Sequence, residues 1–271
     1  MTDEYTRVKE CFFDEGIEYF SALDYRDCVE TGAHIMRRAG LEPRSVLVFL
    51  IPYYGGETVN LSRYAAAKDY HLLIKKLSGR LIERLERIYP DAGFCAFGDH
   101  SPIDERGAAL AAGLGILGDN GLIINEKYGS YVFIADIVTD IAPEEIGAVP
   151  PKRTVKCEGC GACRAACPGG ILSDSNGVCL SAITQKKGEL SDGEKELIRR
   201  TGYAWGCDLC QTVCPHNAAP RLSPIPFFHE DRIERLDSPT LDGMSDEEFT
   251  KRAFAWRGRN TVNRNLKLLG I

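Results

Sequence analysis

The sequence predicts an α+β protein in which an N-terminal mixed α/β domain precedes a smaller cysteine-rich domain. Three observations support this prediction. Strand and amphipathic-helix patterns occur together in the first 150 residues, the proline-containing basic stretch Ala148–Arg153 interrupts them, and eight of the eleven cysteines follow that stretch. We therefore predict domains at residues 1–150 and 151–221, followed by a basic C-terminal helical tail at residues 222–271.

In the first domain, a buried strand is predicted near Val46–Ile51 and a long amphipathic helix over Leu61–Ile88. A short strand at Phe94–Phe97 leads into a turn that precedes the next helix. There Ser101 is predicted to cap the helix, with Asp104 completing a capping box.

A glycine-rich segment, Gly113–Gly118, follows that helix and matches the G-x-G-x-x-G dinucleotide fingerprint. The fingerprint requires a strand before it and a helix after it, whereas here a helix precedes and strand residues follow. We therefore do not expect a nicotinamide or flavin site. The strands predicted at Leu122–Asn125 and Ser130–Thr139 are separated by Glu126–Gly129 and are expected to form a hairpin.

Composition narrows the class of protein. The chain has 271 residues, 44% of them hydrophobic, which can build one sizeable domain and a smaller one. A net charge of −6 argues against a protein that coats nucleic acid, although a local basic patch remains compatible with it. The acidic N-terminus does not resemble a secretory signal, and the longest apolar stretch, Ser45–Tyr54, is far shorter than the roughly 20 residues that span a bilayer. We expect a cytoplasmic protein with no membrane partner.

The cysteine spacing is the strongest motif. A cytosolic chain keeps its thiols reduced, so metal binding is a better interpretation than disulfides. The run from Cys157 to Cys167 is C-x2-C-x2-C-x3-C followed by proline, the bacterial ferredoxin pattern, in which the fourth cysteine reaches a second cluster. A later run repeats the last three of these cysteines, and Cys179 is the available donor for the missing one. The predicted ligand sets for two [4Fe–4S] clusters are Cys157, Cys160, Cys163 and Cys214, and Cys179, Cys207, Cys210 and Cys167.

A pair of zinc ribbons would also contain C-x2-C spacing. The third cysteine of C-x2-C-x2-C would then be surplus, and the two Cys-Pro steps favour the ferredoxin turn. Cys11, Cys28 and Cys95 lack such spacing and are predicted to be ordinary reduced thiols. Because a two-cluster carrier needs only roughly 70 residues, the preceding 150 residues predict a second component that receives the electrons.

Further stretches carry a family likeness. They are Ser62–His71, Asp99–Arg106, Ala112–Gly118, Asp136–Asp140, Cys179–Thr184 and Gly206–Asn217, with Arg257–Gly270 near the end. In these the chain resembles the cobalamin-dependent epoxyqueuosine reductases, relatives of the reductive dehalogenases. The resemblance implies that the N-terminal domain binds cobalamin, that electrons pass from cluster to cluster to cobalt, and that epoxyqueuosine in tRNA is reduced to the alkene with loss of water.

The resemblance also implies site residues. Asp99 aligns with the family's proton donor, and a carboxyl group shielded in a corrin-covered pocket would have its pKa raised enough to hold a proton. From the residues alone, an Asx-turn residue ahead of Pro102 is the favoured interpretation of Asp99, and His100 is an alternative acid. The predicted cobalamin contacts are Tyr64, Gly115, Gly118, Ile123, Ser181 and Asp208. For Tyr64, Ser181 and Asp208 the alternatives are a packing aromatic, a cap and a loop carboxylate.

The substrate is less firmly indicated than the cofactors. The chain stops at Ile271, so the resemblance implies that it lacks the helical-repeat domain with which longer members hold tRNA. It also has Asp119 where the family usually has a lysine, and Gln185–Lys186 where an acidic residue is usual. Phosphate contacts are predicted at Lys152, Arg153, Lys186, Lys187 and the basic stretch Lys251–Lys267. The alternatives are a ferredoxin-type electron carrier, a corrinoid reductase acting on a small molecule, and an RNA-binding module with structural metal. An external electron donor is expected for the reductase.

Overall fold

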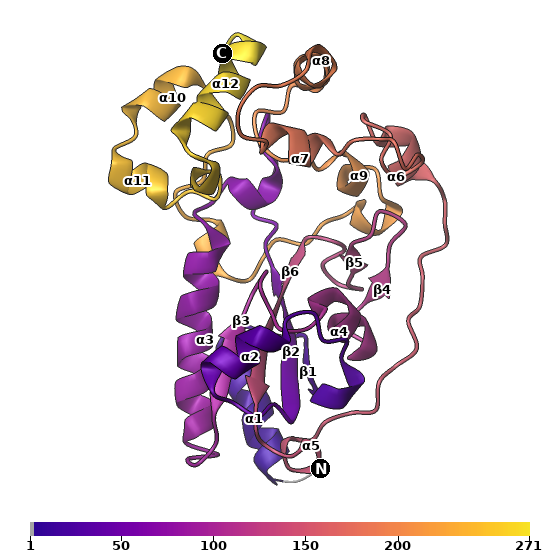
Figure 1. Cartoon of the computed structure of the whole chain (residues 1–271), viewed down its shortest axis with the longest axis vertical. Helices are drawn as coiled ribbons and strands as arrows, with labels where there is room; N and C mark the ends of the chain where they lie inside the picture. The colour runs from indigo at the N-terminus through magenta and orange to yellow at the C-terminus, as the bar shows by residue number, and fades with distance from the viewer. Residues whose placement is uncertain (1–2) are drawn as a thin grey trace. The chain divides into compact units, whose positions relative to one another are not determined.

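The computed structural model describes residues 3–271 (Figure 1). They form two compact units. The first consists of the chain up to Pro52 and of Leu73–Glu158, and the second of Tyr53–Leu72 and Gly159–Ile271. The division near residue 158 lies slightly beyond the boundary predicted at residue 150, and the segment predicted as a tail, 222–271, belongs to the second unit.

An antiparallel four-stranded sheet forms the centre of the first unit (Figure 1). Its strands, in spatial order, are β1 (Phe20–Asp24), β2 (Ser45–Pro52), β6 (Val132–Thr139) and β3 (Phe94–Phe97). Every residue of β2 is buried, because neighbouring strands flank it and both of its faces are covered. The predicted strand near Val46–Ile51 and the predicted bounds of β3 are confirmed.

Helices cover the two faces of this sheet. On one face, Phe12 of α1 (Asp3–Asp14) stacks on Phe20 and meets Phe49 edge-on. Two ion pairs, Arg80–Glu15 and Arg84–Asp14, hold α3 (Tyr70–Glu86) beside α1. On the other face, a second apolar core joins α2 (Ala33–Ala39) and α4 (Glu105–Ala111) to β2 and β6. A short helix, α5 (Pro143–Ile146), follows β6.

Two of the helix predictions are wrong at their N-termini. The helix predicted from Leu61 begins at Tyr70 instead, because Leu61 is buried in the apolar core of the second unit and the Asp69 carboxylate accepts the His71 N–H at 3.0 Å. The predicted capping box is also absent from the described helix start. α4 begins at Glu105, and Ser101 Oγ accepts the N–H of Ile103 instead.

The predicted hairpin of residues 122–125 with residues 130–139 is wrong. β5 (Ile123–Ile124) pairs with β4 (Ile116–Leu117) across the turn Gly118–Gly121, whereas β6 lies between β2 and β3. The reason is burial, since β6 can satisfy its backbone hydrogen bonds along its whole length inside the sheet. The glycine segment follows α4 and leads into β4, which is the sequence context that argued against a dinucleotide fingerprint.

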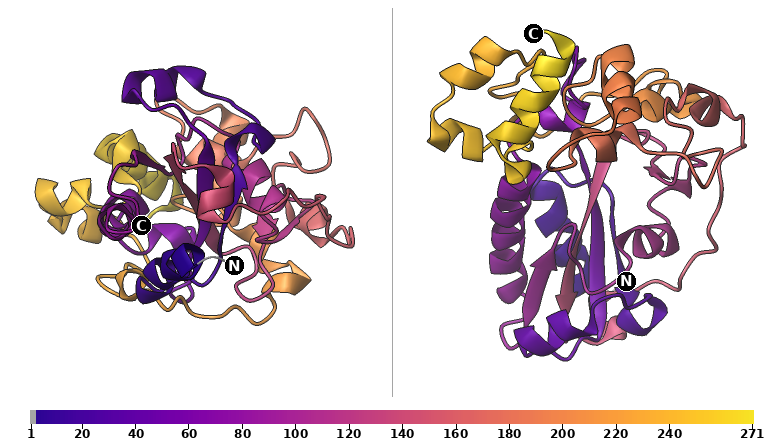
Figure 2. Two further views of the ribbon diagram at one scale, coloured as in Figure 1. Left: turned by 90° about the horizontal axis from the view of Figure 1, so that it is seen from below. Right: turned by 45° about the horizontal axis from the view of Figure 1, so that its top comes forward.

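The second unit is built from short helices. They are α6 (Ala162–Ala166), α7 (Leu180–Thr184), α8 (Asp192–Thr201), α9 (Leu209–Thr212), α10 (Ser238–Gly243), α11 (Asp246–Thr250) and α12 (Arg259–Leu269). The 3-10 turns of the chain are η1 (Tyr25–Asp27), η2 (Arg63–Ala65), η3 (Pro215–Asn217), η4 (Pro226–Phe228) and η5 (Ala255–Arg257). Trp205, Phe254 and Leu266 form a core with Leu61, so the C-terminal segment is packed rather than solvated. Figure 2 shows α10, α11 and α12 grouped together. None of the helices described in residues 3–271 is long and apolar enough to cross a membrane.

Candidate active site and cluster-binding segments

A cavity of about 470 Å³ lies in the first unit, on the face of the sheet that carries α4. Polar wall residues from the loop before α4 and from its first turn are Asp99, Ser101, Asp104, Glu105 and Arg106, and Thr31 and Ser130 add hydroxyl groups. Apolar wall residues include Ile123 of β5 and Ile134 of β6. The cavity therefore combines a few carboxylates with an apolar wall, which is the usual composition of a small-molecule site.

Asp99 has an unusual backbone conformation. Its φ angle is 70°, in the left-handed region that few residues other than glycine adopt. The conformation is held from outside the turn, since the Asp99 N–H donates to Glu105 Oε1 at 2.9 Å. The Asp99 side chain is exposed at the cavity wall, and the described lining residues do not include His100. Such held, sparsely populated conformations cluster at functional sites.

Two further carboxylates near this cavity were missed by the sequence reasoning. Burial raises the pKa of Glu105 to about 7, against the bond from the Asp99 N–H, which lowers it. Burial raises the pKa of Asp136 on β6 to about 8. The signal at Asp136 was available, because it is the one charged residue in the strand sequence Val-Phe-Ile-Ala-Asp-Ile-Val-Thr. Glu105 gave no comparable signal, since acidic residues are common in the first turn of a helix.

Three predicted cobalamin contacts, Gly115, Gly118 and Ile123, lie in the first unit at the β4–β5 hairpin. A Cβ added to Gly115 would lie 2.6 Å from the Ile124 carbonyl oxygen, and one added to Gly118 would lie 2.5 Å from Asn120 Oδ1. The hairpin therefore requires a glycine at Gly115, where the obstacle is backbone, whereas at Gly118 the nearest obstacle is the movable end of a side chain. Ile123 contributes to the cavity wall near Asp99.

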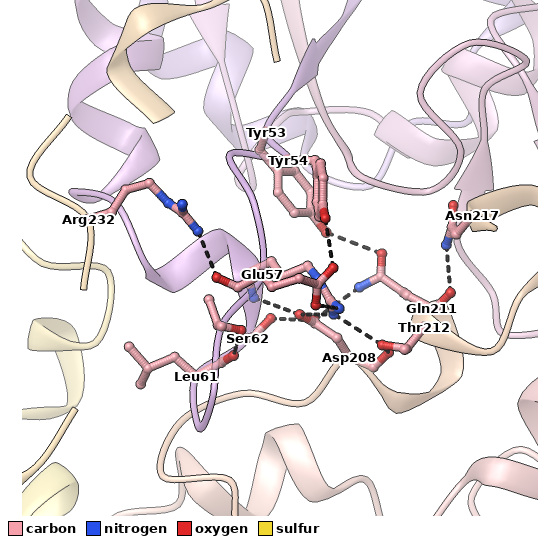
Figure 3. Close-up of polar contacts among 12 residues, drawn as sticks. Tyr53, Tyr54, Glu57, Leu61, Ser62, Asp208, Gln211, Thr212, Asn217 and Arg232 are labelled. Carbon is pink, nitrogen blue, oxygen red and sulfur yellow. Dashed lines mark hydrogen bonds and ion pairs between the residues drawn. The ribbon is translucent and has the colours of Figure 1, made fainter. Parts of the chain in front are cut away.

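The other three predicted contacts lie in the second unit and have partners there. Asp208 is fully buried and accepts Ser62 Oγ at 2.5 Å and the Arg63 N–H at 2.6 Å, with Arg63 Nη1 at 3.4 Å (Figure 3). Tyr64 Oη accepts Trp205 Nε1 at 3.0 Å, and Ser181 Oγ accepts Gln185 Nε2 at 2.9 Å.

The Asp208 contacts join two distant parts of the sequence. Arg63 also forms an ion pair with the exposed Glu57 and donates to Thr212 Oγ1 (Figure 3). Burial raises the pKa of Asp208, whereas the bonds from Ser62 and Arg63 lower it. This network fastens residues 53–72 to the second cysteine run, which explains why they belong to the second unit although they precede α3.

The two cysteine runs form matching turns. Each C-x2-C-x3-C-P run contains a short helix, α6 or α9, and the two helices pack against each other. Cys167 and Cys214 both follow such a helix in extended conformation, as expected for a residue before proline. The backbones of the two runs differ where Gly161, in the left-handed conformation, corresponds to Asp208, which has a negative φ angle.

Cys179 lies near the second run. The pKa of Cys207 is raised to about 12, mainly by burial and partly by the neighbouring groups Cys210, Asp208 and Cys179. All eight predicted ligands are free thiols, seven of them in the second unit. Cys157 is in the first unit, where its Sγ accepts the Asp119 N–H at 3.3 Å. Among residues 3–271, no three His, Cys, Asp or Glu side chains are arranged to hold a single metal ion.

Known proteins share these features. Residues 156–217 match the 4Fe-4S double cluster binding domain family, which supports the iron–sulfur prediction. The chain is 33% identical over 238 residues to the epoxyqueuosine reductase of Leadbetterella byssophila, covering 84% of this chain and 74% of that protein. The chain belongs to the epoxyqueuosine reductase family. The predicted family resemblance is thereby confirmed.

The chain is also similar to other members of the epoxyqueuosine reductase family. The protein from Lactococcus garvieae is 32% identical over 221 residues, which are 76% of this chain and 60% of the relative, so the chain spans about three fifths of that protein. A crystal structure of an epoxyqueuosine reductase with an epoxyqueuosine-modified tRNA-Tyr stem loop has a TM-score of 0.78 at 22% identity, covering 98% of this chain and 81% of that one. This likeness confirms the predicted α+β fold class.

Proposed function

We propose that this chain reduces the epoxide of epoxyqueuosine in tRNA to the alkene, with Asp99 as the proton donor. The observation that carries the proposal is the cavity with Asp99 and Glu105 in its wall, in a chain of this family. An electron carrier would need no such cavity. The net reaction consumes two electrons and two protons and releases the epoxide oxygen as water.

The electrons would enter through two [4Fe–4S] clusters. The donor set fits them, because eight free thiols occur in two ferredoxin runs with matching turns, and Cys179 lies near Cys207. Cys157, Cys160, Cys163 and Cys214 would hold one cluster, and Cys179, Cys207, Cys210 and Cys167 the other. An external low-potential donor would supply the electrons.

Cobalamin is the proposed final electron carrier, and when bound it supplies a low-valent cobalt that delivers electrons to the substrate. In the first unit the residues fit that role, because Ile123 presents an apolar wall to the cavity and the hairpin that carries Ile123 also contains Gly115 and Gly118. Cobalamin contacts by Tyr64 and Ser181 of the second unit, whose hydroxyl groups bond Trp205 and Gln185, stay a prediction. Asp208 fits least well, since its carboxylate is already used by Ser62 and Arg63.

Asp99 would act on the departing oxygen. Expelling an epoxide oxygen as hydroxide is difficult, and a positioned acid makes it easier by protonating the oxygen as the C–O bond breaks. Glu105 accepts a hydrogen bond from the Asp99 N–H and so helps to fix the backbone position from which the Asp99 side chain extends. The apolar side chains of Ile123 and Ile134 line the same cavity and would face the apolar part of a bound substrate.

Fewer basic residues are proposed to contact tRNA phosphates than the sequence suggested, because some of them bond groups of the second unit itself. Lys186, Arg259 and Arg264 are used inside the unit, bonding Glu194, the Leu241 carbonyl and the Gly188 carbonyl respectively. Lys187 and Arg257 instead line a depression of about 390 Å³. Arg257 stacks over the ring of Trp256, which is 56% exposed, and such a pair suits an RNA loop.

The decisive experiment measures queuosine formation. Protein reconstituted anaerobically with iron, sulfide and cobalamin is incubated with epoxyqueuosine-containing tRNA and a reductant, and the nucleosides are analysed by mass spectrometry. Asp99→Asn should lose turnover by a factor on the order of 10²–10⁴ while keeping its clusters. His100→Gln is the matched control and should keep its rate. Near-normal turnover by Asp99→Asn would remove Asp99 from the mechanism.

Iron analysis tests the cluster ligands separately. The reconstituted chain should hold about eight irons, and Cys179→Ala about four, because the Cys207 set would lose one of its four thiolates. Cys95→Ala is the control, since Cys95 lies on β3 outside both runs. Retention of eight irons by Cys179→Ala would contradict the assignment.

A further inference from the structure

The strand β6 carries one carboxylate into the core behind the cavity. Side chains alternate along a strand, so Asp136 lies on the same sheet face as Val132 and Ile134, both of which line the cavity. Its neighbours across the sheet are Val48 of β2 and Phe97 of β3. Asp136 is 0% exposed, so its carboxyl group has lost all contact with bulk water.

The Asp136 carboxyl group has almost no polar support. Within the described part of the chain, neither of its oxygens has a hydrogen-bond partner. The Ser101 hydroxyl is close enough to lower the pKa of Asp136, although it does not reach hydrogen-bond geometry, and the charge of Glu105 raises that pKa. An unpaired charge is very costly at such a position, so the group keeps its proton at neutral pH.

The groups that face Asp136 do not offset a negative charge. They are Glu105 of α4, Ser101 of the preceding loop, and Tyr25 and Cys28 from the segment around η1. The pKa values of Tyr25 and Cys28 are raised, mainly by burial and partly by Asp136, so both remain neutral. No cation among the described residues stabilises an ionised Asp136.

Two of these neighbours also reach the cavity. Ser101 and Glu105 both line it, and Glu105 accepts the N–H of Asp99. Ser101 and Glu105 therefore each act on the buried Asp136 and each also stand in the cavity wall that contains Asp99. The proposed reduction needs two protons for each epoxide, and Asp99 carries only one.

We propose that Asp136 stores the second proton of the reaction and delivers it through Ser101 and Glu105 to the cavity. This inference rests on the proposed function. For each epoxide, two electrons arrive from the clusters, Asp99 gives one proton to the oxygen as the C–O bond breaks, and Asp136 gives the other, so that water leaves. Asp136 is ionised briefly and regains a proton from solvent after product release. Asp136 does not touch the substrate, so its proton reaches the epoxide oxygen only through neighbouring groups.

Infrared spectroscopy of the cluster-loaded protein tests the storage directly. A buried protonated carboxyl group has a C=O stretch that carboxylates lack, and this band should be present at pH 7 and lost as the pH rises through about 8. Asp136→Asn should abolish that band, and the isosteric amide should leave iron content unchanged. Ser101→Ala should keep the band, because it interrupts the route and not the store. A band that is absent at pH 7, or unchanged in Asp136→Asn, overturns the proposal.

The pH profile of turnover tests the delivery. Wild-type turnover should fall as the pH rises through about 8, whereas Asp136→Asn should be slower by about 10-fold at pH 7 and should lose that decline. Ser101→Ala should show the same slowing with the band intact. A uniform loss at every pH would indicate a structural role and overturn the proposal. An inactive wild type that retains the band would overturn the proposed function instead, so the two failures are distinguishable.

Discussion

Asp136 and Asp208 are both 0% exposed, yet their surroundings are opposite. Asp208, in the second unit, accepts bonds from Ser62 and from the backbone and side chain of Arg63. Asp136, in the first unit, has no hydrogen-bond partner among the described residues. The comparison separates two uses of a buried carboxyl group. One is an acceptor that holds segments together, and the other is an acid that keeps its proton.

Neighbouring backbone explains why the two sites differ. Asp208 lies at the start of the short helix α9 and faces the turn η2. There the Ser62 hydroxyl group and the Arg63 N–H donate hydrogen bonds to its carboxylate. Asp136 lies in the middle of a sheet whose backbone N–H groups are already paired with neighbouring strands. The backbone of a central strand therefore offers no free N–H group to the Asp136 carboxyl group.

The largest expected effect is at Asp208. Asp208→Ala leaves Arg63 buried without its internal carboxylate, so the variant should lose about 3–5 kcal/mol of stability. Denaturant unfolding of the anaerobically prepared protein measures this loss, and the Cys207 cluster should be lost with it. A change below about 1 kcal/mol would show that Asp208 is not the acceptor holding this segment, and would erase its contrast with Asp136.

Asp136→Asn, in contrast to Asp208→Ala, should raise the free energy of unfolding relative to wild type, and the gain should depend on pH. The pKa of Asp136 is about 8 in the folded protein, above the value of 3.8 in the unfolded chain, so the folded state binds the extra proton between these values. Wild-type stability should therefore fall relative to Asp136→Asn by about 1.4 kcal/mol per pH unit, or roughly 4 kcal/mol from pH 5 to pH 8. Hydrogen exchange of the β2 and β6 amides measures the difference. Parallel pH dependences would mean that Asp136 is ionised in the folded protein.

A smaller change is expected at Ser62. Ser62→Ala removes one donor to Asp208 and leaves the two bonds from Arg63 and the one from Gln211, so the expected loss is about 1.5–3 kcal/mol, as for hydrogen bonds to charged groups. Thermal unfolding compared with wild type checks it. A loss as large as that of Asp208→Ala would mean that the hydroxyl, rather than Arg63, holds the carboxylate.

The smallest effect is expected at Glu57, which pairs with the same arginine as Asp208 but is 67% exposed. Solvent screens this pair, so Glu57→Gln should cost less than about 1 kcal/mol. The same unfolding assay serves as the matched control for Asp208→Ala. Equal losses in the two variants would show that burial does not set the strength of these bonds.

Local patterns accounted for much of the fold. Strands β2 and β3 were predictable because each is a short, continuous run of apolar residues, which is typical of a strand inside a sheet. The predicted capping box failed because Ser101 bonds Ile103 across its own turn, and the hairpin failed because β6 pairs with strands far away in sequence. Such choices depend on which partners tertiary folding supplies, and sequence spacing does not contain that information.

The sequence by itself determined the eight-cysteine spacing and the family likeness, because both depend on residue identity and short-range separation. Only the tertiary structure decided the roles of the aspartates. The sequence places Asp208 beside the predicted cluster ligand Cys207 and Asp136 in an apolar strand, but it does not say which one meets an arginine. The protonation of a buried carboxyl group depends on the donors brought to it by distant segments, so the fold alone separates a structural acceptor from a proposed proton store.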